Sequence, residues 1–346
     1  MVSLKSFVKM LTGVVALLGT SVAVADGSSV KEQQKQFKAF YEQEWGQTQP
    51  CRETSLNRFA VCSNVLRNEG NAPFMLTNKS SDKVAVLIHG LSDSPFFMRE
   101  IANILFEQGF SVVVPLLPGH GKRDAEDDMS DWDLAERWQQ HVDEVIKLAD
   151  GMGDTLIVGG FSTGGALAVE HYLDGAESID GLMLFSGAMA LSDNAEGMSR
   201  IWGIKLLARI IDGNYETHGP NPYKYPNVAG FAGLELMDLI NTIREKVAEG
   251  QQIDVPLFAA HSQADVTTPI QGVEQLMEAS KGPNTFFVVD ESYSLCHADL
   301  VVNTDLLNDM NFNATMVNQQ EECAIPKANP LFSTMSLMLR DYVSQF

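Results

Sequence analysis

Short apolar runs alternate with helical patterns from residue 84 to residue 289, and this rhythm constrains the fold more than any other feature. The runs are rich in β-branched residues and are too short for helices, so we expect each of them to be a buried strand. They cover residues 84–88, 111–115, 155–158, 182–185, 256–260 and 285–289. Strands that are joined by right-handed helical crossovers predict an α/β fold with a mostly parallel, doubly wound sheet.

Helical patterns fill the intervals between these runs, with apolar residues on one face and a glycine near the end. They cover residues 97–108, 131–150 and 270–280. One interval, residues 186–255, has no strand signal and contains two helical stretches, at residues 198–211 and 233–248. The first stretch is apolar on most sides, so it must be buried or must line a hydrophobic pocket. We interpret the interval as a helical cap over the active site, and a pair of ordinary crossover helices is the alternative.

The N-terminus has the order of charge and hydropathy that is typical of a secretory signal. Lys5 and Lys9 precede an apolar run over residues 10–24, and Ala23-Val24-Ala25 fits a signal-peptidase site. We expect residues 1–25 to be removed on export, which would leave a periplasmic or secreted protein without a stable membrane span. An uncleaved N-terminal anchor is the alternative interpretation.

The rest of the chain divides into a short lead-in and one large domain. Residues 26–76 are polar and mixed, with a possible helix over 31–45 and a loop-rich part over 51–76. Residues 77–346 are long enough for a single α/β domain with a sizeable core. A polar insert, residues 301–330, follows the last predicted strand and precedes the final helix.

The charge balance excludes some classes of partner. The chain has 45 acidic and 24 basic residues, which gives a formal net charge of −21 at pH 7. A surface this acidic argues against nucleic acid and against anionic membranes as partners. The spacing of the histidines and cysteines predicts no metal site.

Four cysteines suggest disulfides, because an even count in an exported chain seldom leaves thiols free. Three connectivities are possible. We favour Cys296–Cys323, which would tie the polar insert to the loop that carries His297, with Cys51–Cys62 as the remaining pair in the lead-in. The alternatives are bonds between the lead-in and the Cys296 loop, or a free and buried Cys296.

A glycine-rich turn marks the nucleophile. The sequence Gly160-Phe161-Ser162-Thr163-Gly164-Gly165 follows the predicted strand 155–158 and opens a helical pattern. G-x-S-x-G between a strand and a helix is the nucleophile elbow, in which small neighbours let the serine project from the end of the sheet. This context predicts a serine hydrolase with Ser162 as its nucleophile, and a purely structural glycine-rich turn is the alternative.

A serine nucleophile needs a base and an acid, which follow it along the chain in this fold. His297 comes after the predicted strand 285–289, and Asp265 comes after the strand before it. We expect His297 to be the general base and Asp265 to hold its imidazole in one tautomer. Asp290 is the main rival for the acid, and a structural role is the alternative for each residue.

The tetrahedral intermediate of acyl transfer also needs donors for its oxyanion. We expect them to be the backbone N–H of Thr163, which follows the nucleophile, and that of Leu91 in the sequence His89-Gly90-Leu91. His89 could be a second base, but it is more often a structural residue packed beneath this loop.

Several of these motifs occur together in one known superfamily. Leu87-Ile88-His89-Gly90-Leu91, Pro118-Gly119-His120-Gly121, the Ser162 elbow, Asp265 and His297 resemble the α/β-hydrolases, in particular bacterial carboxylesterases, monoacylglycerol lipases and lysophospholipases. The resemblance implies the α/β-hydrolase fold, with a cap over an acyl pocket inserted before the triad acid. The signal sequence, the cysteine-bearing lead-in and the 301–330 insert depart from the family pattern.

The resemblance also implies an activity. We expect two-step hydrolysis of small-molecule or lipid carboxylic esters, with a hydrophobic acyl group carried on Ser162 and with no cofactor. A peptidase or an acyltransferase that uses the same triad is the alternative within the superfamily. A more remote alternative is a non-catalytic binding protein on a hydrolase scaffold.

Overall fold

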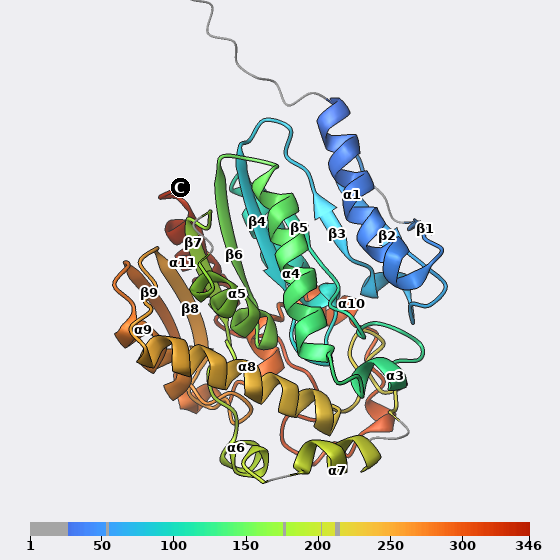
Figure 1. Cartoon of the computed structure of the whole chain (residues 1–346), viewed down its shortest axis with the longest axis vertical. Coiled ribbons are helices and arrows are strands. Elements are labelled where there is room, and N and C mark those ends of the chain that lie inside the picture. Colours follow the sequence, from blue (N-terminus) through green and yellow to red (C-terminus); the bar gives the residue numbers. More distant parts are fainter. Residues whose placement is uncertain (1–26, 53–54, 176–177, 202, 212–214) are drawn as a thin grey trace, which may run out of the picture.

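The computed structural model describes residues 27–52, 55–175, 178–201, 203–211 and 215–346 (Figure 1). The expected signal segment, residues 1–25, lies outside these ranges. Within them, the chain folds into one nine-stranded sheet with helices on both faces. No helix in the described ranges is both long and apolar enough to cross a membrane.

The sheet has the strand order β1-β2-β3-β5-β4-β6-β7-β8-β9. Strands β4 to β9 are parallel, and β1 to β3 add to the β5 edge in antiparallel pairs. Their bounds are β1 Gln49–Pro50, β2 Arg58–Cys62, β3 Phe74–Leu76, β4 Lys83–Ile88, β5 Ser111–Val114, β6 Thr155–Phe161, β7 Gly181–Phe185, β8 Leu257–Ser262 and β9 Asn284–Val289. The six predicted strands and the mostly parallel α/β sheet are therefore confirmed.

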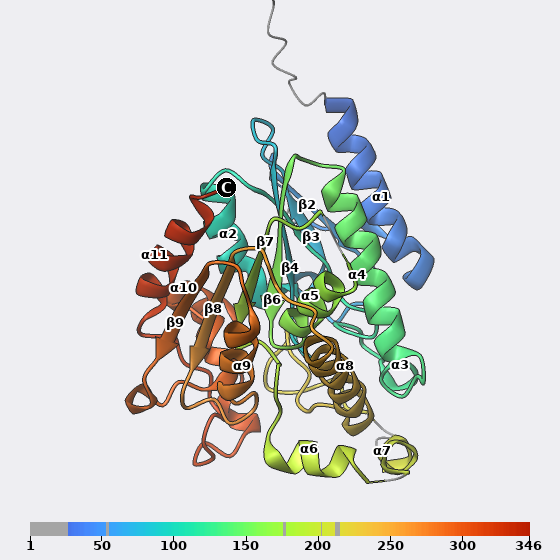
Figure 2. The ribbon, with the colours of Figure 1, turned by 60° about the vertical axis from the view of Figure 1, so that its left-hand side comes forward.

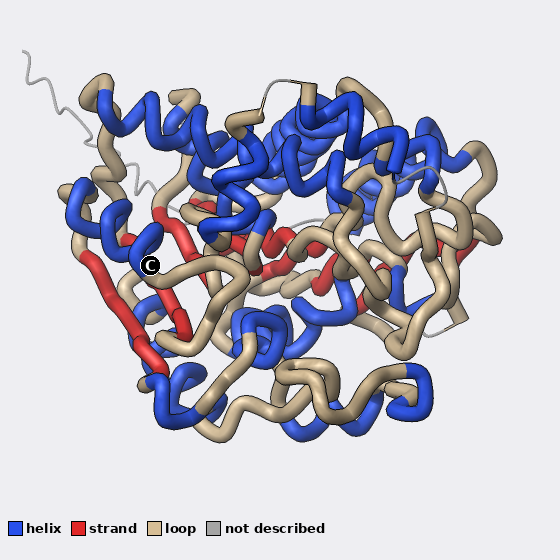
Figure 3. Tube along the Cα trace, turned by 90° about the horizontal axis from the view of Figure 1, so that it is seen from below, coloured by secondary structure: helices blue, strands red, loops and turns tan. Residues whose placement is uncertain are grey.

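Helices form a layer on each face of the sheet. α1, α4, α5 and α8 lie on one face, whereas α2 and α11 lie on the other (Figure 2). Figure 3, which views the molecule from below, shows the strands between these layers. The helices are α1 Gly27–Trp45, α2 Arg99–Glu107, α3 Glu126–Met129, α4 Leu134–Asp150, α5 Thr163–Leu173, α6 Asp193–Ser199, α7 Ile204–Ile211, α8 Gly230–Ala248, α9 Gln271–Ala279, α10 Thr304–Asp309 and α11 Phe332–Val343.

The carboxyl ends of the central parallel strands, and the loops that follow them, lie at one edge of the sheet. β4 and β6 pair in parallel with Ile88 opposite Gly160, so the loop after β4 lies beside the turn after β6. β8 and β9 pair with Ser262 opposite Val289, and their following loops also leave at this edge. Parallel α/β sheets bind ligands at the carboxyl ends of their strands, and this edge is therefore where a site is expected.

The lead-in differs from its prediction. A loop-rich pattern was expected over residues 51–76, but β2 and β3 lie within it and extend the sheet. Phe59 pairs with Met75 and Phe74 pairs with Val114, so these residues continue the ladder from β5. The strands are too short for a period of two to stand out, and their pairing depends on β5, which lies far away in the sequence.

The apolar stretch at 198–211 also differs from its prediction. It covers the end of α6 and all of α7, which lie at one end of the molecule (Figure 1). The stretch was expected to be buried or to line a hydrophobic pocket. Met198 of α6 does line the cavity described below, but three large apolar side chains of α7 neither line it nor are buried. Leu206, Leu207 and Ile210 are 56%, 51% and 69% exposed. α7 instead packs through its polar side, because Lys205 pairs with Glu235 and Asp238 of α8.

The two sides of this region should respond differently to truncation. Leu206→Ala should change the free energy of unfolding by less than about 0.5 kcal/mol, since the side chain already faces water. Leu239→Ala in α8 should cost about 2–5 kcal/mol, because Leu239 is only 3% exposed and packs in the core. Urea denaturation of both variants measures the contrast, and equal losses would mean that α7 is packed against the protein in solution.

Candidate active site

Ser162 occupies a strained turn between β6 and α5. Its φ of 52° and ψ of −116° lie in a region that non-glycine residues seldom adopt. A Cβ at Gly160 or at Gly164 would lie 2.2 or 2.1 Å from the carbonyl oxygen of Ile88, so both positions require glycine. The sequence motif and the strand–turn–helix geometry therefore agree, and Ser162 lines a cavity at the edge of the sheet.

His297 and Asp265 meet at the same edge. Asp265 lies in the loop after β8, and His297 begins a short 3₁₀ helix, His297–Val301, in the segment that follows β9. His297 Nδ1 lies 2.6 Å from Asp265 Oδ2. The His297 ring also lies 4.8 Å from the ring of Phe161, the residue before Ser162, and His297 lines the cavity with Ser162.

The surroundings of Asp265 favour its ionised form. Burial raises the pKa of this carboxyl, but the charge and hydrogen bond of His297, with help from His261 and the backbone N–H of Thr268, outweigh burial and lower the pKa. The N–H groups of Thr267 and Thr268 donate to Oδ1 at 2.9 and 3.0 Å. An ionised Asp265 stabilises the Nδ1–H tautomer of His297, which leaves Nε2 free to accept a proton.

The rival acid, Asp290, has a different role. Its side chain is exposed, and it accepts hydrogen bonds from the backbone N–H and hydroxyl of Ser292 at the start of a 3₁₀ turn. These two bonds lower the pKa of the Asp290 carboxyl. The structure thus brings Asp265 to His297 and leaves Asp290 as a turn residue.

Thr268, which no motif in the sequence marks, links the pair to the sheet. Its hydroxyl lies 3.1 Å from Asp265 Oδ2, 3.1 Å from His297 Nδ1 and 3.2 Å from the carbonyl oxygen of Ser186. A threonine near the acid is the single local sign of this role, and it is too common in loops to be informative.

The two predicted oxyanion donors lie at this edge too. Thr163 begins α5, where the first N–H groups of a helix have no partner within the helix. Leu91 is nearly buried and lines the cavity together with Ser162. His89 lies beneath the loop, with Nδ1 2.8 Å from the carbonyl oxygen of Gly90 and Nε2 accepting the N–H of Leu117 at 3.0 Å. Burial and neighbouring His120 hold its pKa well below the usual value, so His89 is a neutral structural residue.

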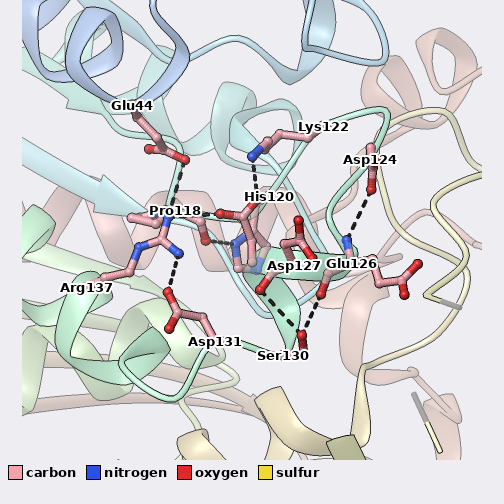
Figure 4. Close-up of polar contacts among 12 residues, drawn as sticks. Glu44, Pro118, His120, Lys122, Asp124, Glu126, Asp127, Ser130, Asp131 and Arg137 are labelled. Carbon is pink, nitrogen blue, oxygen red and sulfur yellow. Dashed lines mark hydrogen bonds and ion pairs between the residues drawn. The ribbon is translucent and has the colours of Figure 1, made fainter. Parts of the chain in front are cut away.

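The Pro118-Gly119-His120-Gly121 loop is fixed by a polar network (Figure 4). Lys122 pairs with Asp128, and Arg137 donates to Asp128 at 2.9 Å and to Asp131 at 2.8 Å. His120 Nδ1 lies 3.0 Å from the carbonyl oxygen of Pro118, and burial lowers the pKa of His120 to about 4. His120 is therefore a neutral support for the loop. No cluster in the described ranges has the residues to hold a metal ion.

The cavity has a volume of about 1180 Å³ and draws its walls from several segments. Phe97, Leu234 and Leu236 give it apolar surface, whereas Lys224 and Asp299 are charged. Residues 312–326 of the polar insert line one side, and parts of the predicted cap, including Met198, line another. Trp202, which belongs to the apolar stretch 198–211, lies outside the described ranges.

Both favoured disulfides are present. Cys51 is bonded to Cys62 in the lead-in, and Cys296 is bonded to Cys323. The second bond joins the residue before His297 to the polar insert, and both of its cysteines line the cavity. It therefore restrains the backbone that carries His297.

The strand–turn–helix geometry is that of the α/β-hydrolase fold, and known proteins of similar sequence and structure have been found. Residues 79–228 match the family described as "Serine aminopeptidase, S33". A thermostable monoacylglycerol lipase from a Bacillus species is 32% identical over 136 residues, which cover 37% of this chain. They cover 48% of that lipase, so the chain spans about half the length of the curated relative that it matches.

Solved structures show the same fold. A structure reported with the metagenome-derived lipolytic enzymes LipS and LipT superimposes with a TM-score of 0.57 at 20% identity, over 71% of this chain and 96% of that chain. A monoacylglycerol lipase of Paleococcus ferrophilus superimposes with a TM-score of 0.53 at 17% identity, over 76% of this chain and 95% of that chain. A soluble variant of the monoglyceride lipase of Saccharomyces cerevisiae superimposes with a TM-score of 0.54 at 11% identity, over 86% of this chain and 94% of that chain. The chain thus has the α/β-hydrolase fold and is similar to monoacylglycerol lipases and other lipolytic enzymes.

The disulfide pairing can be tested directly. Proteolytic digestion without reductant should give one peptide that links Cys51 to Cys62 and another that links Cys296 to Cys323, and mass spectrometry would identify both. Closing the second loop should contribute about 3–4 kcal/mol in the chain-entropy model, so reduction should lower the melting temperature. A Cys296 peptide that alkylates without reductant, or that is linked to the lead-in, would contradict the structure.

Proposed function

We propose that this chain is an exported serine hydrolase that cleaves carboxylic esters through an acyl-enzyme on Ser162. The observation that carries the proposal is the contact between His297 and Asp265 at 2.6 Å, beside a strained serine turn and facing one cavity. Export is supported by the pattern of residues 1–25 and by the two disulfides, which are typical of oxidising compartments.

The proposed reaction has two steps. Ser162 Oγ attacks the ester carbonyl while His297 Nε2 takes the hydroxyl proton, and the N–H groups of Leu91 and Thr163 donate to the oxyanion. Collapse of this intermediate breaks the C–O bond, and His297 protonates the departing alcohol. Water then attacks the acyl-enzyme with His297 again as base, which releases the acid and restores Ser162.

The proposed substrates carry a hydrophobic acyl group. Phe97, Leu191 and Leu236 give the cavity apolar surface, which suits an acyl chain. The similar proteins, which are described as monoacylglycerol lipases and lipolytic enzymes, support the same class of substrate.

A peptidase is the second candidate, because the matching family is described as a serine aminopeptidase. The two activities can be separated by comparing an ester with the amide of the same acid. A higher kcat/KM on the amide would favour the peptidase.

Ser162→Ala should abolish hydrolysis of a p-nitrophenyl ester. Loss of the nucleophile is expected to lower kcat by about 10⁴-fold or more, with little change in the melting temperature. Wild-type protein should also react with a fluorophosphonate probe, and the variant should not. Near wild-type turnover by the purified variant would refute the proposal.

Asp265→Asn should lower kcat by about 10⁴-fold with a small effect on KM, since His297 would lose the partner that fixes its tautomer. Asp290→Asn is the matched control and should leave kcat within about twofold, because Asp290 is an exposed turn residue. Steady-state kinetics on a soluble ester compares them. The reverse ranking would assign the acid to Asp290.

A further inference from the structure

A short segment of the predicted cap lies directly on residues 89–95, the loop that carries Leu91, which we call the oxyanion loop. We call residues 221–225 the strap. The N–H of Tyr225 donates to the carbonyl oxygen of Ser92 at 2.8 Å, and the hydroxyl of Ser94 donates to the carbonyl oxygen of Tyr223 at 2.8 Å. The Tyr223 ring stacks on Phe96 with 3.7 Å between centroids. The strap thus contacts the loop on both sides of Asp93.

An ion pair completes this contact. Lys224 Nζ lies 3.2 Å from Asp93 Oδ1. Asp93 is 2% exposed, and no group in the described ranges donates a hydrogen bond to Oδ1. The Lys224 ammonium thus lies beside a buried carboxyl group two residues after Leu91, and removing one partner of such a pair is costly.

The loop needs an external support of this kind. Ser92, between Leu91 and Asp93, has a φ of 70°, which is in the left-handed region. Non-glycine residues keep that conformation where the surrounding structure imposes it. Two kinds of contact restrain it: the loop's own bond from the Asp93 N–H to the carbonyl oxygen of Gly90 at 3.1 Å, and the contacts of the strap with Ser92 and Asp93, next to Leu91.

The strap is itself held from behind by the lead-in. Arg67 donates to the carbonyl oxygens of Lys224 at 2.9 Å and Asn221 at 3.0 Å. The side chains of Asn68 and Asn71 both donate to the carbonyl oxygen of Pro222. The strap, the oxyanion loop and the lead-in are thus connected by hydrogen bonds and by the Lys224–Asp93 ion pair. Lys224 can therefore influence the position of the oxyanion loop without contacting Ser162.

We propose that Lys224 is a positioning residue, which holds the oxyanion loop through Asp93 so that the Leu91 N–H points at the transition state. The inference rests on the proposed function and adds to it a residue outside the triad. Lys224 also lines the cavity, so the rival role is direct contact with substrate. The two roles differ in kinetics, because a positioning defect lowers kcat whereas loss of a substrate contact raises KM.

Lys224→Met should lower kcat on a soluble oxygen ester by about 10²-fold, the loss expected when a catalytic group is misplaced, with KM within about threefold. The loss on the matching thionoester, whose C=S sulfur accepts hydrogen bonds weakly, should be at least fivefold smaller. Lys224→Arg should keep the ion pair and retain kcat within about threefold. The double variant Asp93→Asn/Lys224→Met removes both charges, so it should fold well and still show the lower oxygen-to-thiono ratio.

Lys246→Met is the matched control. Lys246 forms a comparably buried pair with Glu170 at 2.9 Å, which joins α8 to α5 away from the strap. It should lower the melting temperature without changing the ratio of oxygen-ester to thionoester rates. The inference would be overturned by an unchanged ratio in both Lys224→Met and the double variant, or by a raised KM with normal kcat in Lys224→Met; either result would leave the proposed function standing. An active Ser162→Ala variant would instead remove the proposed function, and the inference with it.

Discussion

The site depends on how closely two segments of backbone approach one another. The turn after β6 and the end of β4 touch at Gly160, Gly164 and the carbonyl of Ile88, where a single Cβ on either glycine would clash. This contact presses the Ser162 turn against the start of the oxyanion loop. The position of Ser162, the proposed nucleophile, relative to the loop that carries Leu91, the proposed oxyanion donor, thus depends on the packing of two neighbouring parallel strands.

The parts of the fold that the sequence predicted are those encoded locally. Buried parallel strands are continuous apolar runs, so β4 to β9 could each be identified without knowing their partners. The glycine-rich turn at Ser162, and the positions of Asp265 and His297 after successive strands, follow from chain order in the same way. Chain order alone ranked Asp265 above Asp290 as the acid that partners His297, and in the structure Asp265 is the one of the two that contacts His297.

The parts that escaped prediction depend on contacts between distant segments. β2 and β3 form because β5 leaves an edge of the sheet free for pairing, and the sequence of residues 51–76 contains no clear strand pattern that would predict this. The exposure of α7 follows from its Lys205 pairing with α8, whereas its composition alone suggested burial. Thr268 and Lys224 belong to no recognisable motif in the sequence. Their proposed roles depend on the side chains of Asp265 and Asp93, which the fold brings beside them.

The antiparallel addition at the β5 side also determines how the sheet ends. Its outermost strand, β1, has two residues, one of which is Pro50, which has no N–H to offer to a further strand. Cys51, the next residue, is bonded to Cys62 of β2. A short edge closed by proline and a covalent link is a poor template for another chain, so this side of the sheet is protected against edge-to-edge aggregation.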